Sequence, residues 1–486
     1  MQLFFANKRK VWKVGEVAGL GHAELTSLFE RRRIPAGTPI LLDEAMRPVE
    51  PVSTWFRKIA LSGLDPKSMR SYAYTVVMLL NFLLARGLDL RSATESDIRE
   101  FRLWRREEAD ETVGEATWDR DSAAIGGLYD FLVDDGYVEA RPWRATRRTA
   151  SLRSGTSRDL RVRHMELEQY LYCRDVGFGG LAPDAGLDET FHGWRPHRNR
   201  AACELALMTG MRVQEWATIL MPELGLETGL RPQSTDLSLS ACAKYSRPRS
   251  VYVPVAAMEL LDPYLHIERP EIVAKAQHSL RRRYRDLFVV QRFEADGTKV
   301  RGCLDGRTIT RVIRDMKPDL RRLTVLETGD GLDPLALFIG QGGRMLTFSG
   351  WDRVRWRAWD RMKEWAAHAA APQLPRRCWV YHDLRHTFAL RLLIFLTREA
   401  LSDAQDQDLP MSTLLDHMTG NPLLVVQCRL GHAQPSTTYR YIRYLKDPMR
   451  EVDDAFREWT ASGGASYVTI ARHLMSLEEH VHAAQR

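Results

Sequence analysis

The sequence predicts a mainly α-helical protein whose second domain also contains a small antiparallel β-sheet. Residues 52–140 and 165–446 repeat apolar residues at three- and four-residue steps, the pattern of one buried helix face. Within the second stretch, residues 237–253 alternate apolar and polar side chains around a polar turn, which is typical of a hairpin. A chain of 486 residues is long enough for more than one hydrophobic core. We therefore expect two domains.

Residues 52–140 are expected to form a compact helical domain. An apolar stripe over residues 69–83 predicts its first long helix. Thr94 and Asp97 have the spacing of a capping box, which predicts the start of the next helix. Residues 1–51 combine several glycines and prolines with little periodicity, so we interpret them as an N-terminal appendage.

Residues 141–164 separate the two predicted domains and are strongly basic. They hold eight arginines and one acidic residue, Asp159. Because charges of one sign repel one another in a packed core, we predict an exposed interdomain linker. Such a linker can also follow a nucleic-acid backbone and add salt-dependent affinity without sequence specificity. The candidate nucleic-acid-binding residues are Arg144, Arg147, Arg148 and Arg153, together with Arg247 in the predicted hairpin turn.

The second predicted domain covers residues 165–446. Helical stripes lie on both sides of the hairpin. Residues 268–350 are rich in arginine and glycine and have weak periodicity, so no element is predicted there. Residues 447–486 repeat apolar residues at helical spacing, which predicts a C-terminal helical tail.

The charge balance is compatible with a polyanionic partner. Lysine and arginine total 70 against 63 acidic residues, a net charge of +7, and 59 of the cations are arginine. Arginine holds phosphates bidentately, although an arginine-favouring genome explains the same excess. The six cysteines form no CxxC pair, and the N-terminal apolar run is too short for a signal peptide. We therefore expect free thiols, no membrane partner and a cytoplasmic location.

Four separated clusters contain the residues with candidate chemical roles. Each cluster alone also has a simple structural explanation: Arg212 and Glu215 have the spacing of a surface ion pair, and Tyr441 suits a core aromatic. The clusters are TGMRVQEW at residues 209–216, AKYSRPRSVYVP at 243–254, HDLRHTFA at 382–389 and LGHAQPSTTYRYI at 430–442.

Taken in order, the four clusters resemble the signature of the tyrosine recombinase (phage integrase) superfamily. That signature is an arginine in a TGxRxxE helix, a lysine in a β-hairpin, an HxxR pair and an LGHxxxxTTxxY ending. The resemblance implies a helical core-binding, SAM-like domain over residues 52–140 and a catalytic domain over residues 165–446. The long interval between the hairpin and the HxxR pair leaves room for an insertion at 268–350. The matching residues are Arg212, Lys244, His382, Arg385, His432 and Tyr441.

These residue types suit the reversible breakage of a DNA phosphodiester. A tyrosine can store the broken bond as a covalent phosphoester, so we expect Tyr441 to be the nucleophile. Two guanidinium forks, Arg212 and Arg385, suit the charge on the phosphoryl oxygens. Lys244, the only lysine between Lys67 and Lys275, can protonate the departing 5′-oxygen, which an always-charged arginine does poorly.

Three further roles complete the expected site. His382 would act as acid and base on the tyrosine side, and His432 would donate a hydrogen bond to the phosphate. Glu215 would orient Arg212 or the neighbouring backbone.

The choice of tyrosine follows the family pattern. Tyr439 and Tyr444 lie beside Tyr441, but the pattern selects Tyr441, nine residues beyond His432. On a helix, Tyr439 and Tyr441 face nearly opposite sides, so only one of them can reach a phosphate. We expect Tyr439 and Tyr444 to pack.

The resemblance implies a site-specific recombinase or integrase that cuts and rejoins DNA through a 3′-phosphotyrosyl intermediate, with no metal or other cofactor. Its partners would be double-stranded DNA and copies of itself, as a tetramer on two DNA sites. Accessory recombinases or DNA-bending factors are further candidates, and on DNA the protein would be associated with a bacterial-type nucleoid. In this family a C-terminal helix often docks on a neighbouring protomer; packing on its own domain is the alternative. The motifs do not separate integration, transposition of a mobile element and dimer resolution.

Other functions stay open. A type IB topoisomerase shares this chemistry, and a DNA-binding regulator can keep the scaffold without turnover, although all six positions are filled. His382 and His386 also have the spacing of two zinc ligands, with Asp383 where a HExxH protease has its glutamate. The cation of Arg385 beside the metal disfavours the zinc hypothesis, and we interpret His386 as a structural partner.

Overall fold

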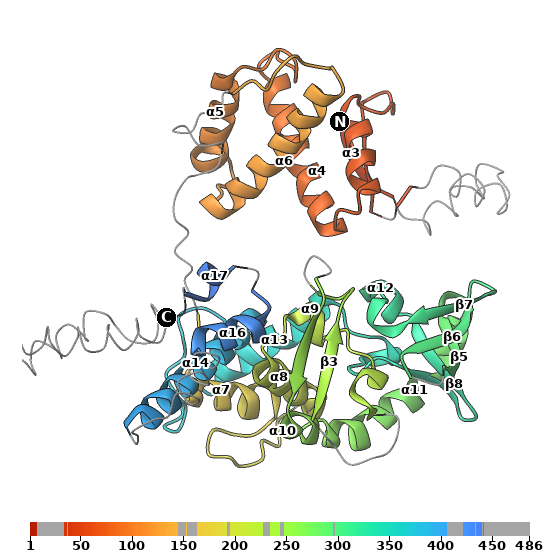
Figure 1. Cartoon of the computed structure of the whole chain (residues 1–486), viewed down its shortest axis with the longest axis vertical. Helices are drawn as coiled ribbons and strands as arrows, with labels where there is room; N and C mark the ends of the chain where they lie inside the picture. The colour runs from red at the N-terminus through yellow and green to blue at the C-terminus, as the bar shows by residue number, and fades with distance from the viewer. Residues whose placement is uncertain are drawn as a thin grey trace, which may run out of the picture. The chain divides into compact units, whose positions relative to one another are not determined.

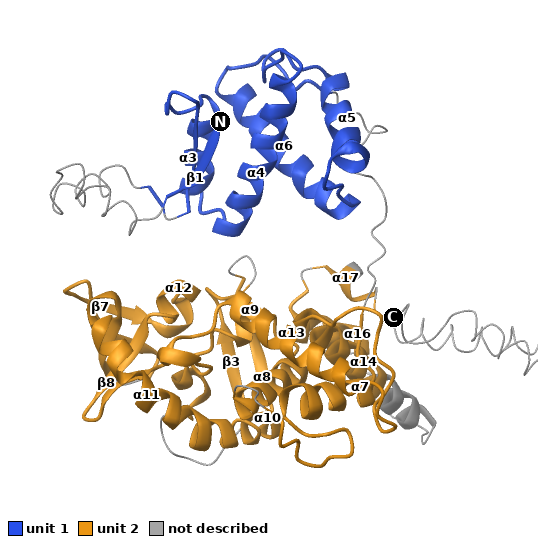
Figure 2. Ribbon diagram, turned by 180° about the vertical axis from the view of Figure 1, so that it is seen from behind, with its two compact units in different colours: residues 1–159 blue, residues 160–486 orange. Residues whose placement is uncertain are grey.

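The chain forms two compact units, Met1–Asp159 and Leu160–Arg486, in the computed structural model (Figure 2). The division falls inside the stretch 141–164 that the sequence analysis interprets as a linker. The structure describes residues 1–6, 34–35, 37–143, 152, 163–191, 195–226, 234–243, 247–294, 297–405, 421–432, 434–439 and 441.

The described part of the first unit is built on four α-helices (Figure 1). Proline at the first position of the second helix and the Asp65 side chain, which accepts from the backbone N–H groups of Lys67 and Ser68, fix where that helix begins. The predicted capping box is present, because Thr94 and Asp97 each accept from the other's backbone N–H. The helices are α3 (Val52–Leu61), α4 (Pro66–Leu84), α5 (Glu95–Leu103), which continues as the π-helix η1 (Trp104–Glu108), and α6 (Glu115–Asp134).

Part of the stretch interpreted as an appendage packs into this unit. Strands β1 (Gln2–Phe5) and β2 (Pro39–Leu42) pair antiparallel, with Gln2 opposite Leu42. Leu41 is fully buried and shares a core with Trp55 and Trp118. These strands therefore extend the core of the helical unit.

The second unit packs its helices around an aromatic core. The rings of Trp216 and Trp351 meet edge to face at 4.8 Å, and Tyr381 packs on both. Such edge contacts stabilise a core beyond the area they bury. The helices that position the motif residues are α8 (Pro196–Thr209), α9 (Val213–Trp216), α13 (Phe348–Glu364), α14 (Tyr381–Gln405), α16 (Pro422–Leu430) and α17 (Pro435–Tyr439).

The small antiparallel sheet that the sequence predicts is present. Strands β3 (Thr235–Leu239) and β4 (Arg249–Val253) pair with Leu237 opposite Val251. Alternate residues of both strands are buried, as expected for a sheet with one face on the core. The mainly helical fold with a small antiparallel sheet is therefore confirmed.

Residues 268–350 hold a second, larger sheet that the sequence analysis does not predict. Its order is β7-β6-β5-β8-β9, and the β5–β8 pair is parallel while the other pairs are antiparallel. Within the unit it lies at the end away from α14 and α16 (Figure 1). The elements are α11 (Arg269–Arg282), β5 (Phe288–Phe293), β6 (Lys299–Leu304), β7 (Arg307–Val312), α12 (Pro318–Arg321), β8 (Thr324–Thr328) and β9 (Gly331–Pro334).

This sheet is not visible in the sequence pattern because its central strand is buried on both faces. Phe288, Val289 and Val290 are consecutive in β5 and all buried. Phe288 and Val290 face the main core, whereas Val289 faces the side that Leu280 of α11 covers. A strand covered on both faces loses the period-two alternation that predicts a strand.

Several predictions fall on residues outside the described parts of the chain. These predictions concern Arg144, Arg147, Arg148, Arg153, Lys244, Tyr444 and the tail at 447–486.

No helix in the described parts is both long enough and apolar enough to span a bilayer.

Candidate active site

Arg212 and Glu215 flank the first turn of α9. Helix α8 is followed by Gly210, whose φ of +61° lies in the left-handed region, and a Cβ there would stand 2.4 Å from Cδ1 of Phe388. Only glycine fits this turn without strain. Two residues later, the Arg212 backbone N–H donates to Oε2 of Glu215 at 2.7 Å, and Arg212 Nη1 donates to Oε1 at 3.2 Å.

Arg249, the first residue of β4, binds the same carboxylate. Its Nη1 donates to Oε1 of Glu215 at 2.8 Å and its Nη2 donates to Oε2 at 2.6 Å. Glu215 is only 1% exposed. Burial alone would raise the pKa of Glu215, but the hydrogen bonds and charge of Arg249, with smaller contributions from Arg212, hold it below its usual range. Glu215 is therefore a buried carboxylate between two arginines.

Arg385, on α14, joins two other clusters. It is 1% exposed; its Nη1 donates to the Gly210 carbonyl and its Nη2 to the Leu430 carbonyl, both at 2.6 Å. Burial, followed by the charge of Arg212, lowers the pKa of the Arg385 guanidinium to about 9, so it stays cationic at neutral pH. One side chain thus ties the end of α8 to the end of α16.

His432 follows a glycine turn at the end of α16. Gly431 has φ +64°, and a Cβ on it would stand 2.5 Å from Cδ of Arg249. The turn places Nδ1 of His432 2.9 Å from the Thr438 hydroxyl. Burial, followed by the charges of Arg385 and other nearby cations, lowers the pKa of His432 to about 3. His432 is therefore neutral at physiological pH.

Tyr441 lies against two histidines. Its hydroxyl is 2.9 Å from Nδ1 of His386, and its ring is parallel to that of His432, with centroids 6.2 Å apart. The side chain is 2% exposed. Burial raises the pKa of the phenol, while the charges of Arg385 and Arg212 oppose the rise.

The two histidines of α14 contact each other. The His382 and His386 rings meet edge to face, with centroids 4.6 Å apart. Burial, followed by the nearby histidines and Arg385, lowers the pKa of His386 to about 3. Asp383, which the zinc hypothesis places as the general base, instead accepts the Val380 backbone N–H at 2.9 Å and pairs with Arg163 at 3.1 Å. These contacts give Asp383 a structural role at the start of α14.

The structure gathers most of the predicted site residues. Contacts of side chains or rings connect Arg212 to Glu215, His432 to Tyr441, and His382 to Tyr441 through His386. Lys244 lies outside the described residues, in the β3–β4 connection. Arg247 is exposed, two residues before Arg249.

The sequence analysis gave Arg249 no role, and it gave His386 none in the recombinase chemistry. Arg249 lies in the strand beyond the predicted turn that contains Arg247. It shares the strand face of Val251 and Val253, which are buried. That alternation is the signal that places it toward the core. His386 was interpreted as a structural partner; in the structure it is the histidine within hydrogen-bond distance of the Tyr441 hydroxyl.

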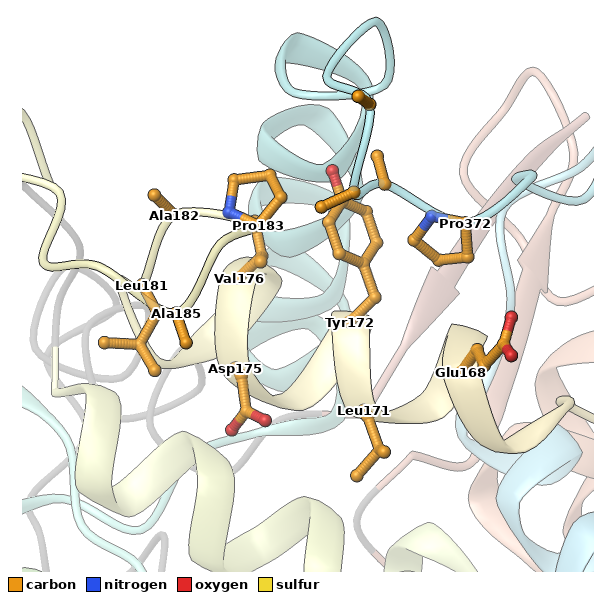
Figure 3. A pocket seen from close by; sticks show the side chains of 13 residues that line it. Glu168, Leu171, Tyr172, Asp175, Val176, Leu181, Ala182, Pro183, Ala185 and Pro372 are labelled. Atoms are coloured by element: carbon orange, nitrogen blue, oxygen red, sulfur yellow. The ribbon is translucent and has the colours of Figure 1, made fainter.

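A separate pocket of about 500 Å³ lies elsewhere in the second unit. Mostly small and apolar side chains from α7 (Leu167–Tyr172), the π-helix η2 (Cys173–Phe178), residues 181–185 and residues 369–372 line it (Figure 3). None of the residues from the four clusters lines this pocket. The pocket is therefore separate from the candidate site.

Comparison with known families identifies the helical unit. Residues 53–136 match the family model described as "Phage integrase, N-terminal SAM-like domain". The first unit therefore contains a phage integrase SAM-like domain, which confirms the SAM-like domain that the resemblance implies there.

Solved structures of recombinases are similar to this chain at low identity. XerH site-specific recombinase, bound to palindromic difH substrate in a post-cleavage complex, matches with 17% identity and a TM-score of 0.46, over 83% of this chain and 82% of that one. The Tn1549 transposon integrase in complex with circular intermediate DNA matches with 13% identity and a TM-score of 0.44, over 80% and 93% of the two chains. XerA recombinase matches with 14% identity and a TM-score of 0.28, over 86% and 100%.

Proposed function

We propose that this chain is a site-specific DNA recombinase that cuts and rejoins double-stranded DNA through a phosphotyrosyl intermediate on Tyr441. The observation that carries the proposal is the contact of the Tyr441 side chain with His386 and His432, at a place where the charges of Arg385 and Arg212 favour the phenolate. These residues come from three clusters that are far apart in sequence. The phage integrase SAM-like domain supports the same function.

The reaction needs a nucleophile, charge stabilisation and two proton transfers. The Tyr441 oxygen would bond to phosphorus as the bond from phosphorus to the 5′-oxygen breaks, leaving a 3′-phosphotyrosyl ester and a free 5′-hydroxyl. Arg212 and Arg385 would stabilise the charge on the phosphoryl oxygens. His382 would take the phenol proton as acid and base on the tyrosine side, and Lys244 would protonate the 5′-oxygen. Attack by a 5′-hydroxyl on the ester then rejoins the strand without an external energy source.

The buried position of Tyr441 implies a movement before attack. The Tyr441 side chain is only 2% exposed, so its hydroxyl is out of reach of a phosphodiester. Both terminal nitrogens of Arg385 donate to backbone carbonyls and are therefore occupied as well. We propose that binding of DNA, and assembly of four protomers on two sites, moves Tyr441 away from His386 toward the phosphate. Binding energy can support such a rearrangement when the assembled state makes the better contacts.

The test is to trap the intermediate. The full chain is incubated with randomly nicked genomic DNA from its source cells, because a nick close to the scissile phosphate lets the freed 5′-hydroxyl fragment diffuse away. Adducts that survive detergent are digested, and mass spectrometry locates the modified residue. We expect a nucleotide 3′-phosphate on Tyr441, and none with Tyr441→Phe.

The outcomes separate the competing functions. Adduct that forms equally with the Phe variant contradicts the assignment of Tyr441. No adduct with the wild-type chain favours the non-catalytic regulator. Relaxation of a supercoiled plasmid that lacks every recovered site favours the topoisomerase.

A further inference from the structure

We propose that Arg249 is a positioning residue of the site: it holds Arg212 in place through Glu215 and sets the turn that carries His432. This inference rests on the proposed recombinase function. Arg249 itself need not touch DNA, because its contacts run to residues that are expected to do so.

The first argument is the arrangement of donors on the Glu215 carboxylate. Oε1 accepts from Nη1 of Arg212 and Nη1 of Arg249, and Oε2 accepts from the Arg212 backbone N–H and Nη2 of Arg249. The two-pronged contact of Arg249 thus fixes the plane of the Glu215 carboxylate. Because Arg212 Nη1 donates to that carboxylate, its position is fixed as well. A lysine, with a single point charge, cannot impose that plane.

The second argument is the packing of the Arg249 stem on Gly431. Any side chain at residue 431 would collide with Cδ of Arg249. The His432 turn therefore rests directly on the aliphatic part of Arg249. Since His432 is the next residue, the position of its ring depends on this contact.

Stability alone does not explain the choice of arginine at residue 249. A buried ion pair is often no more stabilising than apolar residues of similar volume. Here the cost is greater, because the buried Nε of Arg249 has no hydrogen-bond partner in the described parts of the chain. A polar arrangement that leaves a donor unsatisfied is expected where geometry, rather than stability, is selected.

The test uses a substrate that no longer needs the arginine charge. In a methylphosphonate, a methyl group replaces one non-bridging oxygen, so the scissile group is neutral. A defect that acts through Arg212 should shrink on this substrate, whereas a general folding defect should persist. The probes are a nicked duplex recovered by the trapping experiment and the same duplex with a methylphosphonate at the scissile position.

The variants are Arg249→Lys and a matched control, Arg174→Lys. Arg174 also forms a fork with a carboxylate in the second unit, donating to Asp175 at 2.8 and 2.7 Å and to Glu204 at 2.9 Å. It contacts none of the clustered site residues through these bonds. Arg212→Lys serves as the reference for a direct loss at the phosphate.

We expect Arg249→Lys to slow adduct formation on the normal duplex by about 10- to 100-fold, the cost of misplacing a catalytic group by about 1 Å. On the methylphosphonate duplex, Arg249→Lys should form adduct less than about fivefold more slowly than the wild type. Arg212→Lys should show the same reduction of its defect, because both defects come from a lost charge interaction. For Arg174→Lys, the rate of adduct formation relative to the wild type should be the same on both duplexes. Should Arg249→Lys unfold, the double variant Arg249→Gln with Glu215→Gln removes both charges and should show the same rescue.

Two results overturn the inference: normal rates with Arg249→Lys on the unmodified duplex, or an equal deficit on both duplexes. Failure of the wild-type chain to form adduct would instead contradict the proposed function. The two failures are therefore distinguishable in one experiment.

Discussion

The Tyr441 hydroxyl lies 2.9 Å from Nδ1 of His386, although the two residues are 55 positions apart. Burial keeps His386 neutral and the Tyr441 phenol protonated at neutral pH. In that combination the phenol donates and the imidazole nitrogen accepts. The contact therefore holds the nucleophile of the proposed reaction in its buried position.

Removing the acceptor should expose the tyrosine. His386→Leu leaves the buried hydroxyl without its partner, which costs about 1–3 kcal/mol and favours states in which Tyr441 is open to solvent. Nitration of Tyr441, followed by mass spectrometry, should then be faster by about 5- to 150-fold. Tyr439 is 54% exposed and provides an internal control, because its nitration rate should not change. Equal rates of Tyr441 nitration in both proteins would contradict this account of the contact.

The lowered pKa values predict that the fold loses stability in mild acid. The pKa of His386 is about 3 in the folded chain and ordinarily about 6.5 when unfolded, so the unfolded state binds the extra proton between these values. The stabilisation is complete above pH 6.5 and declines as the pH falls toward 3. For His386 the loss between about pH 7.5 and about pH 5.5 is about 1.4 kcal/mol. His432 adds to it with the same sign, but less, because solvent partly screens its ring.

The measurement is the free energy of unfolding of the wild-type chain and of His386→Asn at the two pH values. Comparing the pH dependence of the two proteins cancels the contribution of groups with the opposite sign, such as Asp383, whose pKa burial raises. The variant should lose less stability on acidification than the wild type. Parallel pH profiles would show that His386 does not titrate between the two states.

Two glycines with the same backbone conformation should respond differently to alanine. Gly431 (φ +64°) and Gly225 (φ +67°) are both left-handed, so each Ala substitution costs about 1–2 kcal/mol in backbone strain. At Gly431 the new Cβ also meets Cδ of Arg249 at 2.5 Å, whereas at Gly225 nothing lies within 4 Å. Overpacking adds about 1–3 kcal/mol at Gly431 alone.

Chemical denaturation of the two variants measures this difference. Gly431→Ala should be less stable than Gly225→Ala by at least about 1 kcal/mol. Equal stabilities would indicate that the His432 turn moves freely away from Arg249. That result would also weaken the positioning role proposed for Arg249.

Local signals in the sequence were sufficient for much of the fold. The capping box at Thr94 and Asp97 and the alternation around Leu237 and Val251 depend on neighbours in sequence, and both features are present in the structure. The sheet at 288–334 could not be predicted in this way. Its central strand is buried on both faces by elements distant in sequence, so the alternation that marks a strand is missing.

The same distinction between local and distant signals applies to the residues of the candidate site. Motif spacing selects Arg212, Arg385 and Tyr441 for roles that the structure leaves as predictions. Spacing does not show which histidine of α14 meets the Tyr441 hydroxyl, because that depends on how residues beyond α16 pack on α14. Nor does it show that Arg249 shares a carboxylate with Arg212, since the two arginines come from different elements.

The basic stretch before the second unit should contribute to DNA affinity through charge alone. Each arginine that neutralises a phosphate releases counterions, and the slope of log affinity against log salt changes by about 0.9 per contact on duplex DNA. Replacing Arg144, Arg147, Arg148 and Arg153 together with glutamine should therefore make the slope shallower by up to about 3.6. The affinity should fall alike for recovered-site and unrelated duplexes, because backbone contacts carry no sequence information. Fluorescence anisotropy titrations at several salt concentrations measure both quantities, with the wild-type chain as reference. An unchanged slope would mean that these arginines contact no phosphate, and a loss confined to the recovered site would mean that they read bases instead.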